Sequence, residues 1–275
     1  MKKETIAIIL ILIILGLGVF VAIKYSSSIN IKNIVLGNKN SEDQIQQINS
    51  ETKNYSAKSP QYNYEVKADY PEFSGLKNID AQNKINQDVK SSIITIAEQF
   101  ETDSKTNCDF SNLPGPKPEW ICEMSAAFDG FNLVNNKILS VKIVYYQFTG
   151  GAHGGATYEF INYNAANGER INWESVFKKD SGYLKIISDY SKNNLGQQLL
   201  KPEDSMSDSG WIEEGTAPKN ENYNTNVGFT KDGFLVIFQQ YQVAAYAAGP
   251  QEVTVPYDQL KDAIDSSGAL AGIIK

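Results

Sequence analysis

An apolar run from Ile6 to Ile23 constrains the fold most, because it holds no charged or strongly polar side chain. At about 1.5 Å per residue, a helix of this length spans a hydrocarbon core of about 30 Å, whereas a soluble helix is seldom apolar on every side. Lys2 and Lys3 precede the run and favour a cytoplasmic N-terminus. We therefore expect residues 1–24 to be an uncleaved anchor that crosses the cell membrane once, with the bulk of the chain extracytoplasmic.

A cleaved signal peptide is the alternative for this segment. Signal peptides have a shorter apolar core of about 7–15 residues, which ends in small residues at the cleavage site. Here the run continues directly into Lys24 and Tyr25 without an A-x-A pattern, and no cysteine follows closely that could carry a lipid. These features favour the anchor.

The charge balance excludes one class of partner. The chain has 32 acidic and 25 basic residues, a net charge of -7, and its basic residues are not clustered. Nucleic-acid binding relies on clustered Lys and Arg, so we expect no nucleic-acid partner. A modest acidic excess suits a basic protein partner.

Cys108 and Cys122 are the only cysteines in the chain. An even count outside the cytoplasm is typical of a disulfide, and closing the Pro-rich loop between them would contribute about 3 kcal/mol. A metal pair is the alternative, but two cysteines without a nearby histidine cannot complete a zinc site. We expect a disulfide, no metal and no other cofactor.

The chain after the anchor is predicted to divide into a stalk and two domains. Residues 25–60 are rich in Ser, Asn, Lys and Gln, which predicts a polar stalk with a short helix at 41–51. Apolar periodicity then predicts an N-terminal α+β domain over 61–148 and a C-terminal domain over 149–275.

Both domains show the order strand, helix, pair of strands. In the first these elements are a strand at 62–70, an amphipathic helix with its apolar face between Ile85 and Phe100, and strands at 120–128 and 137–148. In the second they are a strand at 156–164, a helix with its apolar face between Leu184 and Leu199, strands at 226–230, 234–241 and 252–257, and a short closing helix at 258–265. The pattern is typical of an α+β fold in which helices pack on antiparallel sheets.

Two motifs of small residues interrupt these strands. The first, TGGAHGG, runs from Thr149 through Gly150, Gly151, His153 and Gly154, and its glycines permit positive φ and close backbone approach. The second, AAYAAGP, carries Tyr246, Gly249 and Pro250 and follows Tyr241 closely. These nine residues are the candidate binding residues, and we expect the two motifs to lie side by side. The alternative is that they only shape two tight turns, with His153 bonded to local backbone.

The same motifs carry a resemblance to a known family. The stretch YYQFTGGAHGGATYEFINYNAANGERINWESVF, together with GFLVIFQQYQVAAYAAGPQEVTVPYDQL, resembles the extracytoplasmic domain shared by RsiV, a lysozyme-sensing anti-sigma factor, and the peptidoglycan deacetylase PdaC. The N-terminal half resembles the domain that usually precedes it. Only residues 1–5 lie before the apolar run and the chain ends soon after the module, so we expect a stand-alone, membrane-anchored member.

The resemblance implies a binding module for a cell-wall glycan or for an envelope or secreted protein such as a lysozyme. A wall carbohydrate-active enzyme that uses carboxylates is one alternative, and a structural partner of another membrane protein is another. His153 is the only histidine, so any Ser–His relay would require it. Adjacent acids such as Glu213 and Glu214 seldom flank a scissile bond. We therefore expect no catalytic residues and no enzymatic activity.

Overall fold

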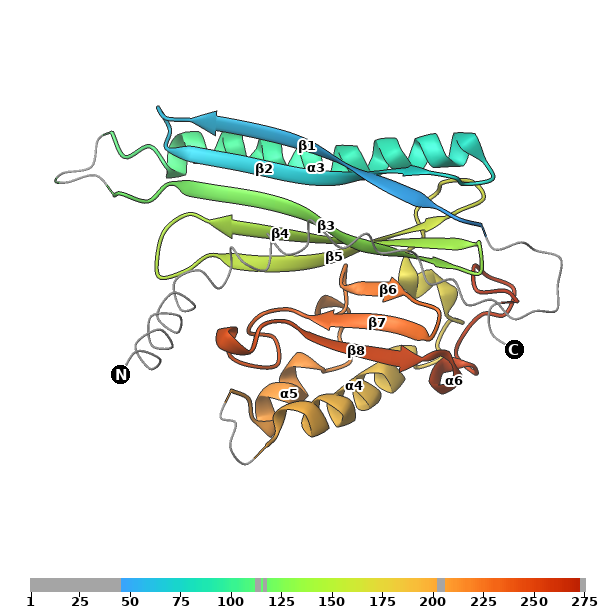
Figure 1. The fold of residues 1–275 in the computed structure, drawn as a ribbon. Coiled ribbons are helices and arrows are strands. Elements are labelled where there is room, and N and C mark those ends of the chain that lie inside the picture. Colours follow the sequence, from blue (N-terminus) through green and yellow to red (C-terminus); the bar gives the residue numbers. More distant parts are fainter. Residues whose placement is uncertain (1–45, 112–114, 116–117, 202–205, 273–275) are drawn as a thin grey trace, which may run out of the picture. The chain divides into compact units, whose positions relative to one another are not determined.

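The computed structural model describes residues 46–111, 115, 118–201 and 206–272 (Figure 1). The anchor expected over residues 1–24 lies outside these ranges. Within them, no helix combines the length and the apolar character that a membrane crossing requires. The described residues all belong to one compact unit.

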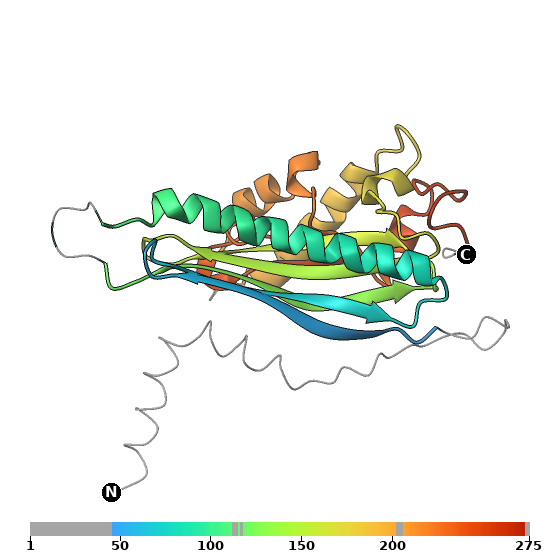
Figure 2. The same cartoon turned by 90° about the horizontal axis from the view of Figure 1, so that it is seen from above.

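A five-stranded sheet forms the first half of this unit, with its strands in chain order. The strands are β1 (Asn49–Ser59), β2 (Tyr64–Ser74), β3 (Cys122–Val134), β4 (Ile138–Phe148) and β5 (Gly155–Asn164). Neighbouring strands are antiparallel except β2 and β3, which are parallel. A parallel pair needs a long crossover, and helix α3 (Ile79–Asn107) supplies it while lying across one face of the sheet (Figure 2).

Helix α3 follows from its sequence. The side chain of Asn78 caps its first turn by accepting hydrogen bonds from the backbone N–H groups of Asp80 and Ala81. Its apolar residues recur every three or four positions, and Ile85 and Ile93 are completely buried against the sheet. The amphipathic helix expected here is confirmed.

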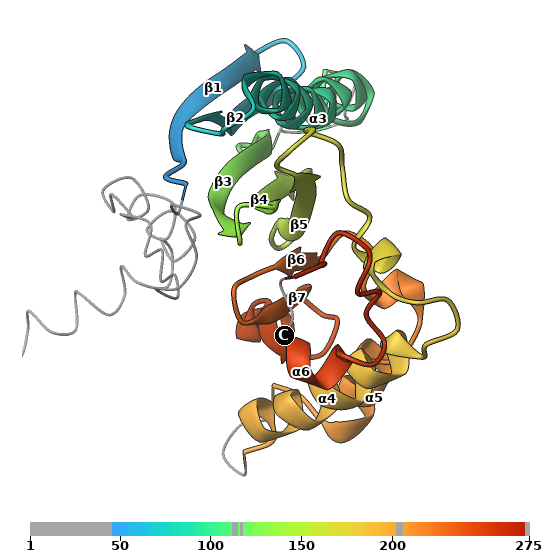
Figure 3. The same ribbon diagram turned by 90° about the vertical axis from the view of Figure 1, so that its right-hand side faces the viewer.

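A three-stranded antiparallel sheet forms the second half. Its strands are β6 (Val227–Phe229), β7 (Gly233–Phe238) and β8 (Gln251–Pro256). Helix α4 (Tyr183–Leu199) packs on β8 and contacts α5 (Ser209–Gly215) and α6 (Tyr257–Leu260). Figure 3 shows the three helices near one another. Short 3-10 turns occur at Trp173–Val176, Asn220–Asn222 and Tyr246–Ala248.

Buried polar groups join the two sheets. The Asn162 side chain on β5 donates to the Val227 carbonyl at 3.0 Å, and the Ser140 hydroxyl on β4 accepts from the Phe229 N–H at 3.0 Å. Ser140 also donates to Asn162 at 2.6 Å. Strand β6 therefore satisfies part of its backbone with side chains of the first sheet, as buried polar groups require.

The α+β class is confirmed, but three details of the expected organisation are wrong. Residues 49–59, assigned to the stalk, form edge strand β1, and the helix expected at 41–51 is absent from its described part, 46–51. Strand β5 was expected to open the second domain. It instead pairs with β4 as the fifth strand of the first sheet, so the sheet extends past the boundary expected at 148.

Candidate functional site

The TGGAHGG motif forms the connection between β4 and β5, and residues 149–154 are called the His153 loop below. Gly150 has φ of +115° and lies on the ring of Trp120, where a Cβ atom would come within 2.9 Å of the indole. Gly154 is buried, and a Cβ there would lie 2.5 Å from the carbonyl oxygen of Gln147. The loop can therefore follow this path only with glycine at both positions.

The segment that leads from β7 to the second motif is tied directly to β5. The Gln239 side chain accepts from the N–H of Tyr158 at 2.9 Å and donates to its carbonyl at 2.7 Å, so the amide continues the pairing of a strand. The Gln240 side chain accepts from the Ala156 N–H at 3.0 Å. These bonds place Tyr241 and the turn that starts at Tyr246 beside the His153 loop.

An aromatic stack forms where the two motifs meet. The rings of His153 and Tyr246 lie face to face, with centroids 3.8 Å apart and an angle of 22°. The Tyr246 hydroxyl donates to the Gly154 carbonyl at 3.1 Å, and the Tyr241 hydroxyl lies 3.3 Å from His153 Nε2. The expectation that the two motifs lie side by side is confirmed.

The hydrogen bonds of His153 define its tautomer. Nδ1 lies 2.9 Å from the Gly154 carbonyl oxygen, which can only accept. Nδ1 therefore carries a proton, and in the neutral ring Nε2 is free to accept from the Tyr241 hydroxyl. The histidine bonds to local backbone, as one interpretation of the sequence held, and it also presents a ring face to Tyr246.

A pocket of about 220 Å³ opens at this stack and is called the His153 pocket. Its lining residues are His153, Gly154, Gly155, Ala156, Gln240, Tyr241 and Tyr246. Small-molecule sites usually measure about 300–1,000 Å³, so this pocket suits a single ring or one extended side chain. The described lining includes no carboxylate, and a neutral ligand with hydroxyl or amide groups matches it.

The backbone at Tyr241 is strained. Its φ is +66°, although it is not glycine, and its side chain is 53% exposed. The indole N–H of Trp211 donates to the Tyr241 carbonyl at 2.9 Å and helps to hold this conformation. Strained residues of this kind cluster at binding and catalytic sites.

The structure separates the nine predicted residues into two groups. His153, Gly154, Tyr241 and Tyr246 line the pocket. The other five do not line the pocket. Thr149, Gly150 and Gly151 shape the loop, and Gly249 and Pro250 form the link from the Tyr246 turn to β8. The sequence interpretation missed Gln240, for which the polar pair Gln239 and Gln240 directly after strand β7 was the available signal.

A larger hollow of about 530 Å³ lies elsewhere, between α4 and α5. It is lined by Lys192, Asn193, Gly196, Gln197, Leu200, Ser209 and Ile212, and it contains neither motif. We base the site on the His153 pocket, because several hydrogen-bonding groups and a strained residue converge there. In the described parts of the chain, no group of three or more His, Cys, Asp or Glu residues could hold a metal ion.

The expected disulfide between Cys108 and Cys122 is present. It joins the C-terminal end of α3 to the first residue of β3, and both sulfur-bearing residues are fully buried.

Comparisons with known proteins match both halves of the chain. Residues 57–156 match the model of the family described as Deacetylase PdaC, and residues 174–258 match a protein family of unknown function, DUF3298. The His153 loop lies in the first match, and Tyr241 and Tyr246 lie in the second. The pocket thus combines one motif from each region.

Individual proteins are also similar to this chain. The chain is 31% identical over 134 residues to the peptidoglycan-N-acetylmuramic acid deacetylase PdaC of Bacillus subtilis, which covers 48% of this chain and 28% of that protein. It is 26% identical over 127 residues to the immunogenic protein MPT64 of Mycobacterium tuberculosis, covering 46% of this chain and 50% of that one. The chain thus spans half or less of these relatives.

A solved structure shows the same fold. A DUF3298 family member from Bacteroides fragilis superposes with a TM-score of 0.57 at 17% identity, covering 83% of this chain and 97% of the other. With the two family matches, this likeness confirms the resemblance found in the sequence. The chain belongs to the family of PdaC/DUF3298-type domains.

Proposed function

We propose that this protein is a non-catalytic binding module on the extracytoplasmic side of a cell membrane, and that its His153 pocket binds a sugar ring of a cell-wall glycan. The observation that carries the proposal is the solvent-accessible stack of His153 on Tyr246 beside the exposed Tyr241 ring. Aromatic residues with polar tips suit ligands that are apolar on one face and polar at the edge. A sugar ring has this character.

The polar groups of the pocket support the same ligand class. Gln240 uses its Oε1 to accept from Ala156, while its Nε2 has no partner within the described residues. That amide is available to a hydroxyl or acetamido oxygen. The Tyr241 hydroxyl lies 3.3 Å from His153 Nε2, and as the donor to the neutral ring it retains lone pairs that accept from a ligand hydroxyl.

The relatives favour a cell-wall ligand over other sugars. The name of the Bacillus subtilis protein describes an activity on peptidoglycan, and the shared region covers only 28% of that protein. Its activity belongs to the whole protein. For this chain we propose recognition of the glycan without turnover, since the described lining of the pocket offers no carboxylate or metal-ligand set.

The test is a titration of the full chain in detergent with soluble peptidoglycan glycan fragments, followed by calorimetry. We expect saturable binding that His153→Ala and Tyr246→Ala each weaken about tenfold or more, equivalent to about 1.4 kcal/mol. Tyr70→Ala on β2 is the matched control, because this tyrosine is half-buried and does not line the pocket. Binding of a lysozyme but not of glycan would reject the sugar ligand.

Chromatography of the fragments after incubation tests the absence of catalysis. We expect their retention to be unchanged. Shortened or deacetylated products that disappear when one Asp or Glu is replaced would support an enzyme instead.

A further inference from the structure

We propose that Trp120, held in place by the Cys108–Cys122 disulfide, positions the His153 loop, so that breaking the disulfide weakens ligand binding at the His153 pocket. The positioning of the His153 loop by Trp120 is independent of what the pocket binds. The effect on binding rests on the proposed function.

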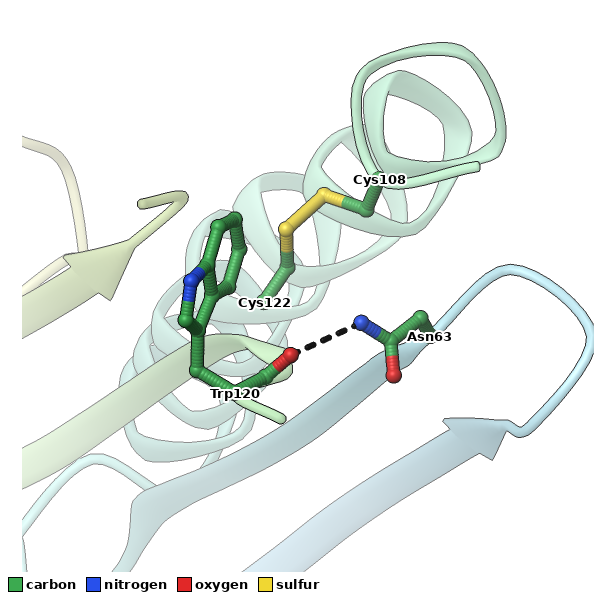
Figure 4. The surroundings of a disulfide bond; sticks show 4 residues. All are labelled: Asn63, Cys108, Trp120 and Cys122. Carbon is green, nitrogen blue, oxygen red and sulfur yellow. Dashed lines mark hydrogen bonds between the residues drawn. A yellow bond between two sulfur atoms is a disulfide. The ribbon is translucent and has the colours of Figure 1, made fainter. Parts of the chain in front are cut away.

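The first step links the disulfide to Trp120. The Cys122 N–H donates to the Asn63 carbonyl at 2.9 Å, and the Asn63 side chain donates to the Trp120 carbonyl at 2.9 Å (Figure 4). Asn63 lies in the turn between β1 and β2 and has φ of +53°. Both ends of the short segment from Trp120 to Cys122 are therefore fixed to one residue, and the disulfide fixes Cys122 to α3.

The second step is the packing of the Trp120 ring. Phe110, two residues after Cys108, packs edge-on against it with ring centroids 4.9 Å apart. Phe148, the last residue of β4, packs against it at 5.4 Å. The disulfide thus holds together the two chain segments that supply Phe110 and Trp120, and their aromatic cluster ends at the base of the His153 loop.

The third step connects Trp120 to the ligand site. The backbone of Gly150 lies directly on the indole, which leaves no space for a side chain. His153 follows three residues later, a reach of at most about 11 Å of extended chain. The loop is therefore fixed at one end by Trp120 and at the other by the bonds of Gly154 and the stack on Tyr246.

Loss of the disulfide would release the first of these two attachments. Reduction by a dithiol transfers two electrons and two protons to the sulfur pair, which gives two protein thiols and a disulfide on the reductant. The segments that carry Phe110 and Trp120 would then be joined only by weaker contacts. The same surface would bind ligand in the oxidised protein and bind it less well in the reduced protein.

His153 provides a readout that needs no ligand, because it is the only histidine in the chain. Its ring protons give one set of NMR signals, which the facing Tyr246 ring shifts. The experiment records these signals and glycan affinity in the oxidised full chain, after dithiol reduction, and in the Cys108→Ala/Cys122→Ala variant. Gly150→Ala, which forces a Cβ against Trp120, tests the contact itself.

Two variants control for general effects. Gly130→Ala is matched to Gly150→Ala, since Gly130 has φ of +125° but no atom lies within 4 Å of the point that an added Cβ would occupy. Trp120→Phe keeps an aromatic ring and should retain most of the His153 shift, whereas Trp120→Ala should lose it. Amide spectra confirm that each protein is folded.

We expect reduction, the double cysteine variant, Gly150→Ala and Trp120→Ala to move the His153 signals toward those of an unstacked histidine. Glycan affinity should fall about tenfold, which corresponds to about 1.4 kcal/mol of binding free energy. The inference is overturned if these changes leave the His153 signals where Gly130→Ala leaves them. If the signals move but the oxidised wild type binds no glycan, the positioning role stands and the proposed function fails.

Discussion

Tyr241 offers the sharpest test of the site, because a glycine variant should be more stable than an alanine variant there. At most positions alanine gives the more stable protein. A residue with a Cβ atom pays about 1–2 kcal/mol to adopt a left-handed conformation, and Tyr241 has φ of +66°. Glycine avoids this strain but loses about 0.5–1 kcal/mol through the greater freedom of the unfolded chain. We therefore expect Tyr241→Gly to be more stable than Tyr241→Ala by about 0.5–1 kcal/mol.

At an ordinary position the order is reversed, and alanine is more stable than glycine by about 0.5–1 kcal/mol. The assay is urea unfolding of both variants at one pH, with equal m-values required before midpoints are compared. If Tyr241→Ala has the higher midpoint, the strain argument is refuted. Both variants remove the ring that lies beside His153, so both should lose glycan affinity whatever their relative stability.

Three further predictions concern stability. Replacing Cys108 and Cys122 by Ala should lower the free energy of unfolding by about 3 kcal/mol, and an unchanged urea midpoint would contradict this. Asn162→Leu should cost about 2–3 kcal/mol, because it leaves the Val227 carbonyl buried without its donor; a loss within the error of the melting curve would rule that out. Burial lowers the pKa of Lys142, but hydrogen bonds to carboxylates on β3 and β8 outweigh burial and raise the pKa above its ordinary value of 10.5. The charged Lys142 should therefore stabilise the protein fully below about pH 10.5, and this contribution should disappear as the pH rises further. In Lys142→Met the decline of stability over that pH range should be flatter.

The sequence predicted elements with strong periodicity and missed those without it. Helix α3 and strands β2 to β4 carry a clear apolar pattern, and the structure contains all of them. Strand β1 has no such pattern, because it is an edge strand whose first four residues are exposed and whose alternate residues are only half-buried. Its polar composition is what edge strands use to avoid unwanted pairing, and it looks like a stalk. No helix was predicted between Leu199 and Asn226, where α5 forms.

The partner of β5 could not be read from its alternation alone. An alternation of apolar and polar residues indicates that one face of the strand is buried, but it does not indicate which sheet the strand joins. The short His153 loop was the better signal, since antiparallel neighbours are commonly joined by short connections. The expected repeat of strand, helix and strand pair therefore overstated the symmetry, and the structure places β5 in the first sheet.

The candidate site depended on a different kind of information. His153 and Tyr241 are 88 positions apart in the chain, and no local pattern connects positions so distant. The family resemblance supplied that connection, while the glycines of the loop indicated unusual backbone without naming the neighbours that require it. Trp120, whose ring lies against Gly150, carries no such mark and emerged only from the packing.

The position of the pocket explains why small residues, strain and aromatic rings occur together. The His153 loop turns the chain from β4 to β5, and the Gln239 amide joins the end of β7 to β5. The segments that leave the strand ends come close through a side-chain amide, glycines and a left-handed residue. A surface assembled in this way is fixed by both sheets, so it can hold a ligand ring at low entropic cost. The same dependence makes it sensitive to the disulfide segment that supports one of its two edges.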